Sequence, residues 1–173
     1  MARGDIYSRI NAGDDDRLPV SQRQCSPHEA VITETFHTGR IWSGIGGHVE
    51  SNEHGDLRSA CLREIKEETG LQSEDVKELA LRYVILRQRK QELRQQFIYF
   101  GTTTKTELGT TDEGTLHWMP TSQVFNCKMT DSNRLMLMHY FDNEPSSRVW
   151  VGTTYGEAGQ ARMNWASMSD WEP

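Results

Sequence analysis

The chain has 173 residues and a formal net charge of −6 at pH 7, and this length is enough for one domain with a sizeable core. No apolar run is long enough to span a membrane, and no basic stretch followed by an apolar one indicates a secretory leader. We expect neither a membrane nor a nucleic acid polymer as a partner. Three cysteines without paired or metal-ligand spacing predict reduced thiols in a cytoplasmic protein.

The first 28 residues are polar and include a run of aspartates at 14–16 and prolines at 19 and 27. We expect residues 1–28 to be mostly irregular, and we treat them separately from a single domain over residues 29–173. Residues 30–36 have the composition of a strand, and Thr38 and Gly39 predict a turn before Ile41 and Trp42.

A short helix is predicted after the Gly46-Gly47 loop, and Gly70 followed by Leu71 is typical of a helix that ends at a glycine C-cap. Its apolar stripe, which predicts docking on a core, consists of Leu57, Ala60, Cys61 and Ile65. A glycine pair in the loop before it lets the backbone approach a ligand closely.

The same helix carries three glutamates, Glu64, Glu67 and Glu68, on one arc of about 100°. Like charges at these spacings destabilise a helix by roughly 0.2–0.5 kcal/mol per pair. A divalent cation, which prefers carboxylate oxygens, would offset this repulsion. A solvated acidic surface is the alternative explanation.

The remainder of the chain is predicted to be rich in strands. Residues 79–86 and 97–100 form a hairpin across the charged segment 87–94, and residues 116–119 form a shorter strand. Thr130 and Asp131 begin a helix with Leu135, Met138 and Phe141 at helical spacing, and we expect Met136 and Met138 to fill the core. Residues 149–155 read as the last strand, and 156–159 as a turn into a tryptophan-bearing tail.

The stretch from Gly47 to Leu71 resembles the Nudix box, Gly-x5-Glu-x7-Arg-Glu-U-x-Glu-Glu-x-Gly-U, in which U is apolar. Gly47 and Glu53 fit its first half. Its second half is matched at every fixed position, by Arg63, Glu64, Ile65, Glu67, Glu68, Gly70 and Leu71. Nine residues rather than seven separate Glu53 from Arg63, which indicates an enlarged loop, so that either Glu53 or Asp56 is a candidate partner of Arg63.

The resemblance implies an α/β fold, the α/β/α sandwich of Nudix proteins with a mixed central sheet. It also implies a metal-dependent hydrolase that cleaves nucleoside diphosphates linked to another group. Mg²⁺ or Mn²⁺ would be held by Glu64, Glu67, Glu68 and the Gly47 carbonyl, and would reverse the local charge in front of a polyanionic substrate. Arg63, Glu53 and Gly70 would be structural, with the Arg63 fork holding a carboxylate.

Candidates for the catalytic carboxylates come from two places. Within the box, the family's usual general base is Glu64, and Glu67 is a further catalytic candidate. Outside it, Glu113 precedes the strand at 116–119, a region from which some Nudix families supply a metal-binding or catalytic glutamate. A polar turn is the alternative explanation for Glu113.

Substrate contacts are expected from Trp42, which stands beside the loop and could stack on a base, and from Arg82, which with Arg87 and Arg89 could reach phosphates. The alternatives are a core tryptophan and solvated arginines.

The order of elements from 81 to the late helix also resembles bacterial Nudix proteins described as 8-oxo-dGTP diphosphatases. This favours a nucleoside triphosphate, oxidised or not, cleaved to monophosphate and pyrophosphate. The alternatives are cleavage of ADP-ribose or a similar diphosphate, a non-catalytic nucleotide-binding module, or a protein whose acidic face is merely solvated. A homodimer through the late strands and the tail is compatible with the sequence.

Overall fold

A mixed β-sheet is the centre of the computed structural model, which describes residues 4–12, 30–35, 41–105, 107–109, 115–143 and 147–169. Seven strands follow one another in the order β3-β2-β1-β5-β4-β7-β8, and β6 pairs with β2. The strands are β1 (Gly4–Ala12), β2 (Ala30–Thr35), β3 (Ile41–Ser43), β4 (Lys77–Arg89), β5 (Glu92–Thr103), β6 (Thr115–Met119), β7 (Trp150–Glu157) and β8 (Gln160–Ser167). Pairs β1–β2 and β4–β7 are parallel, whereas the other neighbours are antiparallel.

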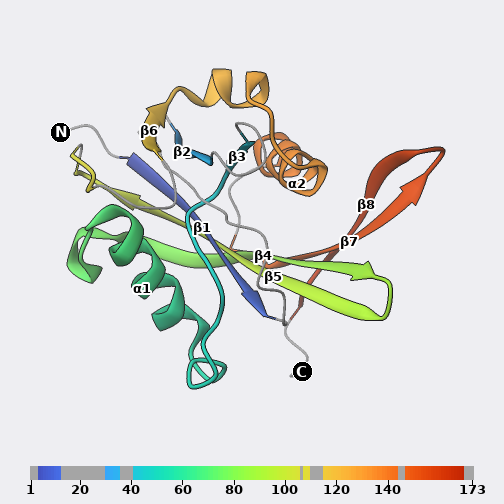
Figure 1. Cartoon of the computed structure of the whole chain (residues 1–173), viewed down its shortest axis with the longest axis horizontal. Coiled ribbons are helices and arrows are strands. Elements are labelled where there is room, and N and C mark those ends of the chain that lie inside the picture. Colours follow the sequence, from blue (N-terminus) through green and yellow to red (C-terminus); the bar gives the residue numbers. More distant parts are fainter. Residues whose placement is uncertain are drawn as a thin grey trace.

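Two α-helices cover opposite faces of this sheet, α1 (Leu57–Thr69) on one and α2 (Asp131–Asp142) on the other (Figure 1). Short 3₁₀ helices occupy Ser73–Asp75 and Thr121–Asn126. The predicted α/β/α sandwich with a mixed central sheet is therefore confirmed. Within the described residues, no helix is long and apolar enough to cross a membrane.

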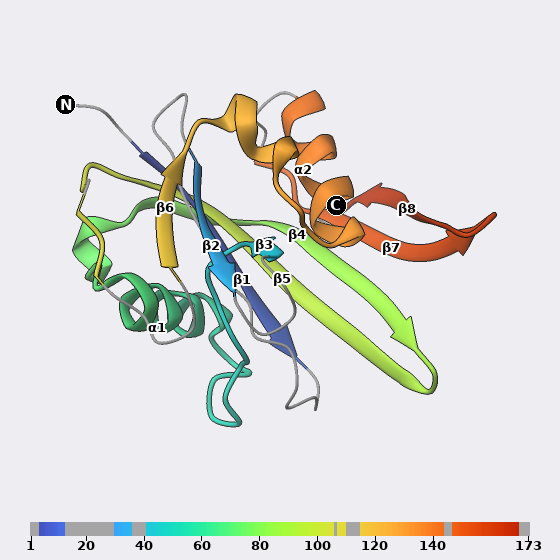
Figure 2. The ribbon, with the colours of Figure 1, turned by 45° about the horizontal axis from the view of Figure 1, so that its top comes forward.

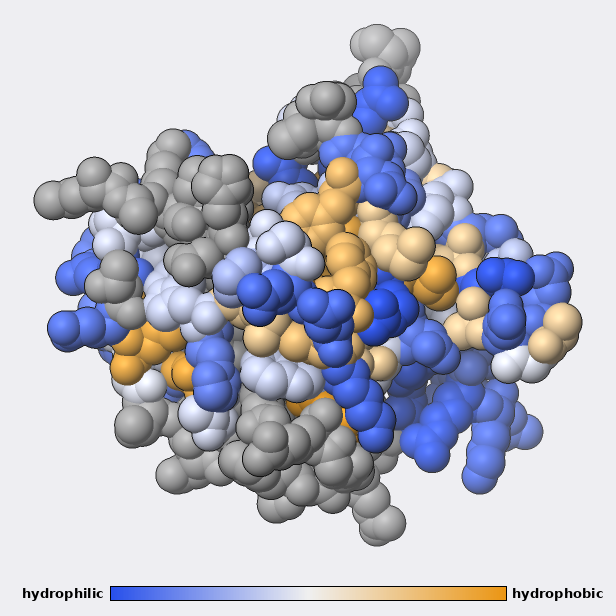
Figure 3. Space-filling model, turned by 90° about the horizontal axis from the view of Figure 1, so that it is seen from above, coloured by the Kyte–Doolittle hydropathy of each residue, from blue (hydrophilic) through white to orange (hydrophobic). Residues whose placement is uncertain are grey.

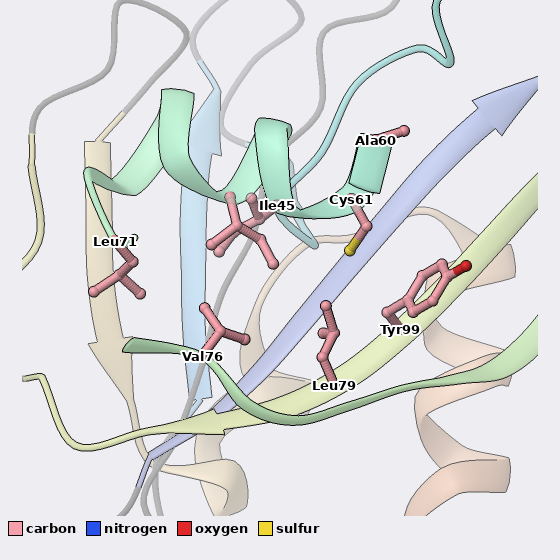
Figure 4. Close-up of a cluster of buried hydrophobic side chains, with 8 residues drawn as sticks. Ile45, Ala60, Cys61, Leu71, Val76, Leu79 and Tyr99 are labelled. Atoms are coloured by element: carbon pink, nitrogen blue, oxygen red, sulfur yellow. The ribbon is translucent and has the colours of Figure 1, made fainter. Parts of the chain in front are cut away.

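Each helix has its own hydrophobic cluster. The side chains between α1 and the sheet are shown in Figure 4 and include Ile45, Ala60, Cys61, Ile65, Leu71, Val76, Leu79 and Tyr99. The cluster under α2 comprises Tyr83, Ile85, Ile98, Phe100, Val124, Cys127, Met136 and Leu137. Side chains alternate along a strand, so β4 and β5 supply both clusters from their two faces.

Helix α1 ends where its sequence predicts, and a side-chain cap fixes its start. The Asp56 carboxylate accepts a hydrogen bond from the Ser59 amide at 3.0 Å and so caps the first turn. Gly70 adopts a left-handed conformation at φ 76°, and its amide donates to the Lys66 carbonyl. The predicted stripe faces the core, with Ala60, Cys61 and Ile65 fully buried.

Helix α2 begins after its Thr130 cap, as predicted, but buries a different face from the one we expected. Its buried residues are Ser132, Asn133, Met136 and Leu137, whereas Met138 and Phe141 are 46% and 43% exposed. The prediction that Met138 fills the core is wrong. Two polar residues lie on the buried face, and hydrophobic periodicity does not count them. The apolar residues on the outer face contribute to the hydrophobic patch over α2 in Figure 3.

The N-terminal segment contains a strand that we did not expect. Residues Gly4–Ala12 form β1, which pairs with β5 from Gly4↔Thr103 to Ala12↔Gln95 and lies inside the sheet. The prediction that residues 1–28 are mostly irregular is therefore wrong for this part. The partner strand lies about ninety residues further along the chain, so local composition does not reveal the pairing.

The hairpin and the C-terminal strands are longer than predicted. Strands β4 and β5 continue through the charged segment and leave only Lys90 and Gln91 in the turn, so the hairpin extends far beyond the helices (Figure 2). The predicted strand at 149–155 is β7, but it is not the last, because the tryptophan-bearing tail forms β8. The turn expected at Thr38 and Gly39 lies outside the described residues.

Candidate functional site

A glycine-rich loop connects β3 to the turns that precede α1, and the carboxylates of α1 contact this loop. The Gly46 amide donates a hydrogen bond of 2.8 Å to Glu68 Oε1, and the Glu68 side chain is buried, with the residue 4% exposed. A buried carboxylate is costly unless it accepts hydrogen bonds, so this contact fixes both the loop and the last turn of α1.

Gly47 lies directly against the Glu64 carboxylate. A Cβ atom at position 47 would lie 2.6 Å from Glu64 Oε1 and 2.7 Å from Oε2, closer than Cβ atoms approach other atoms in proteins. Only glycine permits this close approach of the loop backbone to the carboxylate. The structure thus brings together Gly47 and Glu64, which we expected to share a ligand.

Arg63 connects the loop to the acidic side of α1. Its Nε and Nη2 atoms each donate at 2.8 Å to one oxygen of Glu53, in the bidentate geometry that suits a guanidinium and a carboxylate. Its Nη1 atom donates at 2.9 Å to both Glu64 Oε1 and Glu67 Oε2. Nη2 also donates to the His48 carbonyl at 3.1 Å. One arginine therefore joins three glutamates and the loop backbone.

Protonation follows from these contacts. The hydrogen bond from Arg63 is the main reason that the pKa of Glu53 falls from 4.5 to about 2. The same carboxylates raise the pKa of Arg63, so the pair is charged at every physiological pH.

Glu53 and not Asp56 pairs with Arg63, because Asp56 is used as the helix cap. The two additional residues of the box are accommodated in the turns at 51–55 without moving Glu53 away.

The chemistry of this donor set suits a divalent cation. Glu64 and Glu67 already approach one cationic nitrogen at 2.9 Å each, which shows that their oxygens reach a common point. Among the residues that the structure describes, no three His, Cys, Asp or Glu side chains converge on one metal position. The contacts of these candidate donors are therefore separate: Glu64 and Glu67 meet at Arg63, Glu64 also lies against Gly47, and Glu68 accepts from the Gly46 amide.

Two of the other predicted site residues, Trp42 and Arg82, lie within the described part of the chain. Glu113 is outside the described residues. The last described residue before it is Gly109, whose amide donates at 2.7 Å to the carbonyl of Thr69, the residue that follows Glu68. Trp42 is half-buried against the cluster under α2, and its ring centroid lies 5.5 Å from that of His117. Arg82 lies on β4 at the point where the register with β5 shifts between Leu81 and Tyr83. Such an irregularity turns a side chain away from the regular alternation.

Sequence reasoning missed a buried polar contact behind the loop. Asn133 Nδ2, in the first turn of α2, donates to Ser43 Oγ at 3.1 Å, and both residues are buried. The Trp42 amide also donates to the Lys128 carbonyl at 2.8 Å, so β3 is joined to the segment before α2. These contacts fix the start of the loop three residues before Gly46. The only signal in the sequence is an asparagine on the inner face of a helix, which apolar periodicity overlooks.

Comparisons with known proteins identify the family and the fold of this chain. The family model described as the NUDIX domain matches residues 14–141, which is most of the chain. No curated protein sequence matches. The crystal structure of the mutator MutT protein from Bacillus halodurans is similar, with a TM-score of 0.62 and 20% identity over 97% of this chain and 100% of that one. A Nudix hydrolase from M. smegmatis, RenU, has a TM-score of 0.51 and 15% identity over 66% of this chain and 73% of its own. At these identities the two structures show the shared fold.

Proposed function

Because the chain belongs to the Nudix family and is a Nudix hydrolase, we propose that it cleaves a phosphate anhydride of a nucleoside diphosphate derivative with the help of Mg²⁺ or Mn²⁺. The observation that carries this proposal is the contact of Glu64 and Glu67 with one cationic nitrogen beside the glycine loop. Carboxylates that converge beside a glycine loop suit the binding of a metal–phosphate complex.

The residues of this chain have separate roles in the proposed reaction. Glu64, Glu67, Glu68 and the Gly47 carbonyl would hold the metal, which when bound neutralises phosphate charge and lowers the pKa of the attacking water. Glu64 would accept a proton from the attacking water, with Glu67 beside it. Arg63 and Glu53 position these carboxylates and the loop, and the Gly70 cap ends the helix behind them.

The second candidate for the general base, Glu113, lies outside the box. Glu113 belongs to the segment between Gly109, which is bound to the C-terminal end of α1, and Thr115, where β6 begins. This connection supports a role beside the box carboxylates. A comparison of Glu113→Gln with Glu64→Gln identifies the base, because its loss removes the acidic limb of the pH–rate profile.

For the substrate, we propose a nucleoside triphosphate, oxidised or not, that is cleaved to monophosphate and pyrophosphate. Trp42 would stack on the base, since it lies on β3 just before the loop, and Arg82 would contact a phosphate. The alternatives are ADP-ribose or another nucleoside diphosphate derivative. The domain is proposed to include β1 as well as residues 29–173, because β1 lies inside the same sheet.

The decisive experiment is a screen of nucleoside triphosphates, 8-oxo-dGTP, ADP-ribose and dinucleotide polyphosphates with Mg²⁺ or Mn²⁺, with identification of the products. The double variant Glu67→Gln/Glu68→Gln is expected to lose activity. The matched control is Glu74→Gln, a charge loss at an exposed glutamate of the 3₁₀ helix after α1. Turnover that survives in the double variant would overturn the proposed mechanism.

The same screen separates the enzyme from a non-catalytic nucleotide-binding module. Such a module gains thermal stability from nucleotide and Mg²⁺ but forms no product. If Mg²⁺ changes neither the melting temperature nor tryptophan fluorescence, the acidic face is merely solvated.

We further propose a cytoplasmic location, in keeping with the free thiols of Cys61 and Cys127. A homodimer stays a prediction, which light scattering in solution tests.

A further inference from the structure

The end of the β4–β5 hairpin carries a cluster of positive charge, whereas the carboxylates of α1 form a cluster of negative charge. Four basic residues and one acidic residue occupy positions 87–94 of a chain whose net charge is −6. The hairpin extends away from α1 (Figures 1 and 2), and its end is covered by hydrophilic side chains at the lower right of Figure 3. Arg87 lies on the same face of β4 as Tyr83 and Ile85, which is the α2 face.

Two arginines stand directly opposite each other in this hairpin. Arg87 pairs with Arg94 in the β4–β5 register, an arrangement that is unfavourable for like charges. Neither side chain is fully solvated, since Arg87 is half-buried and the side chain of Arg94 is 16% exposed. Glu92 balances Arg94 through a contact of 3.0 Å between its carboxylate and Arg94 Nη2.

Arg87 has no such counter-charge. Within the described part of the chain, its guanidinium forms no hydrogen bond and no ion pair. Burial lowers the pKa of Arg87, and the charges of Arg94 and Arg89 lower it further. A guanidinium has five N–H donors, so a half-buried one without acceptors is costly unless a ligand supplies them.

The neighbouring strand places a hydroxyl beside this arginine. Arg87 pairs with Thr154 in the parallel β4–β7 register, so both side chains leave the same face of the sheet. The Thr154 hydroxyl is buried and has no hydrogen-bond partner in the described structure. Buried hydroxyls are almost always hydrogen-bonded. Arg87 and Thr154 are therefore two adjacent donors that both lack an acceptor among the described residues.

We propose that Arg87 and Arg94, with Thr154 beside them, form a binding site for the phosphoryl group of a small phosphorylated molecule. The guanidinium fork of Arg87 would hold two phosphate oxygens, and the bound anion would relieve the repulsion between the two arginines. The site lies on the sheet face opposite α1, so it requires neither the box carboxylates nor a divalent cation.

Titration calorimetry in EDTA tests this proposal independently of hydrolysis. Inorganic phosphate, pyrophosphate and a nucleoside monophosphate are titrated separately into wild type, Arg87→Gln and Arg162→Gln. The last variant is the matched control, because Arg162 is an exposed arginine of β8 that pairs with Glu157. We expect at least a tenfold weaker affinity in Arg87→Gln and less than a twofold change in Arg162→Gln.

The arms of the titration also identify the source of the phosphate. Equal affinity for pyrophosphate and the nucleotide means that the phosphoryl group alone is recognised, whereas binding of the nucleotide alone means that its base contributes. Equal affinity in wild type and Arg87→Gln, or no binding of any of the three compounds, would overturn the proposal.

Thermal melting provides a second readout. In phosphate-free buffer Arg87→Gln should melt at or above the wild-type temperature, because it removes the like-charge pair. Pyrophosphate should raise the melting temperature of the wild type but not that of the variant. Arg87→Lys, which keeps the charge but loses the fork, should bind with intermediate affinity; unchanged affinity in this variant would also contradict the site.

Discussion

Arg63 and Arg87 lie on opposite sides of the sheet and in opposite electrostatic environments. Arg63, on α1, contacts Glu53, Glu64 and Glu67, and these carboxylates raise its pKa. Arg87, at the far end of β4 on the other face, has arginines as neighbours, and burial together with their charge lowers its pKa. The difference teaches that the first arginine positions other groups of the protein, whereas the second is left with donors for a molecule from outside.

The largest effect is expected when a carboxylate that Arg63 contacts is removed. Glu64→Gln should lower kcat by roughly 10²–10⁴-fold, because the variant loses the proposed base and a metal-ligand oxygen together. Steady-state kinetics with Mg²⁺ and the substrate found in the screen measure this effect, and Glu74→Gln serves as the control. Wild-type kcat in Glu64→Gln would remove Glu64 from the reaction.

Removal of the two arginines should change stability in opposite directions. Arg63→Gln leaves three carboxylates near one another without their shared cation, and should lower the free energy of unfolding by about 2–3 kcal/mol. Arg87→Gln removes an unfavourable cross-strand pair and should leave stability unchanged or raise it by up to about 1 kcal/mol. Urea unfolding at neutral pH in phosphate-free buffer measures both. Destabilisation of similar size in the two variants would abolish the contrast between the two regions.

The close approach of the loop to Glu64 is tested by a single methyl group. Gly47→Ala places a carbon within 2.6–2.7 Å of the Glu64 oxygens, so the loop or the carboxylate must shift, at a cost of about 1–3 kcal/mol. Gly55→Ala is the matched control in the same connection, because a Cβ there meets nothing within 4 Å. We expect a loss of melting temperature and activity in the first variant only. Equal behaviour of the two variants would show that the loop does not need its contact with Glu64.

The smallest effect concerns pH. The pKa of Glu53 is lowered to about 2 in the folded protein, so Glu53 contributes stability that is fully present above its unfolded value near 4.5. This contribution is lost as the pH falls from about 4.5 towards 2, when Glu53 becomes protonated and its bond to Arg63 weakens. Urea midpoints between pH 7 and pH 3 should therefore fall more steeply for wild type than for Glu53→Gln. Parallel curves would mean that the Arg63–Glu53 pair adds no net stability.

Local signals predicted the region around α1 well. Gly70 and the buried stripe of α1 act within one or two turns of the helix, so their effects are visible in a short window of sequence. The β4–β5 hairpin was predicted for the same reason, since its two strands adjoin in the chain. The contact between Gly47 and Glu64 was expected only from the family resemblance, because seventeen positions separate the two residues.

Features that depend on distant partners were not predicted. β1 has no apolar pattern strong enough to be identified, and its place depends on β5. The inner face of α2 includes Asn133, whose partner Ser43 lies ninety residues earlier. The pairing of Arg87 with Thr154 arises from a parallel crossover between β4 and β7, which no local pattern contains.

The sequence by itself determined the acidic helix, its glycine C-cap, its glycine loop and the family to which they belong, because each of these depends on spacing along one short segment. Only the tertiary structure decided which carboxylate Arg63 holds, which face of α2 is buried, and which arginine is left without a carboxylate. These outcomes depend on electrostatic and packing contacts between segments that are distant in the chain, and such contacts exist only once the sheet has formed.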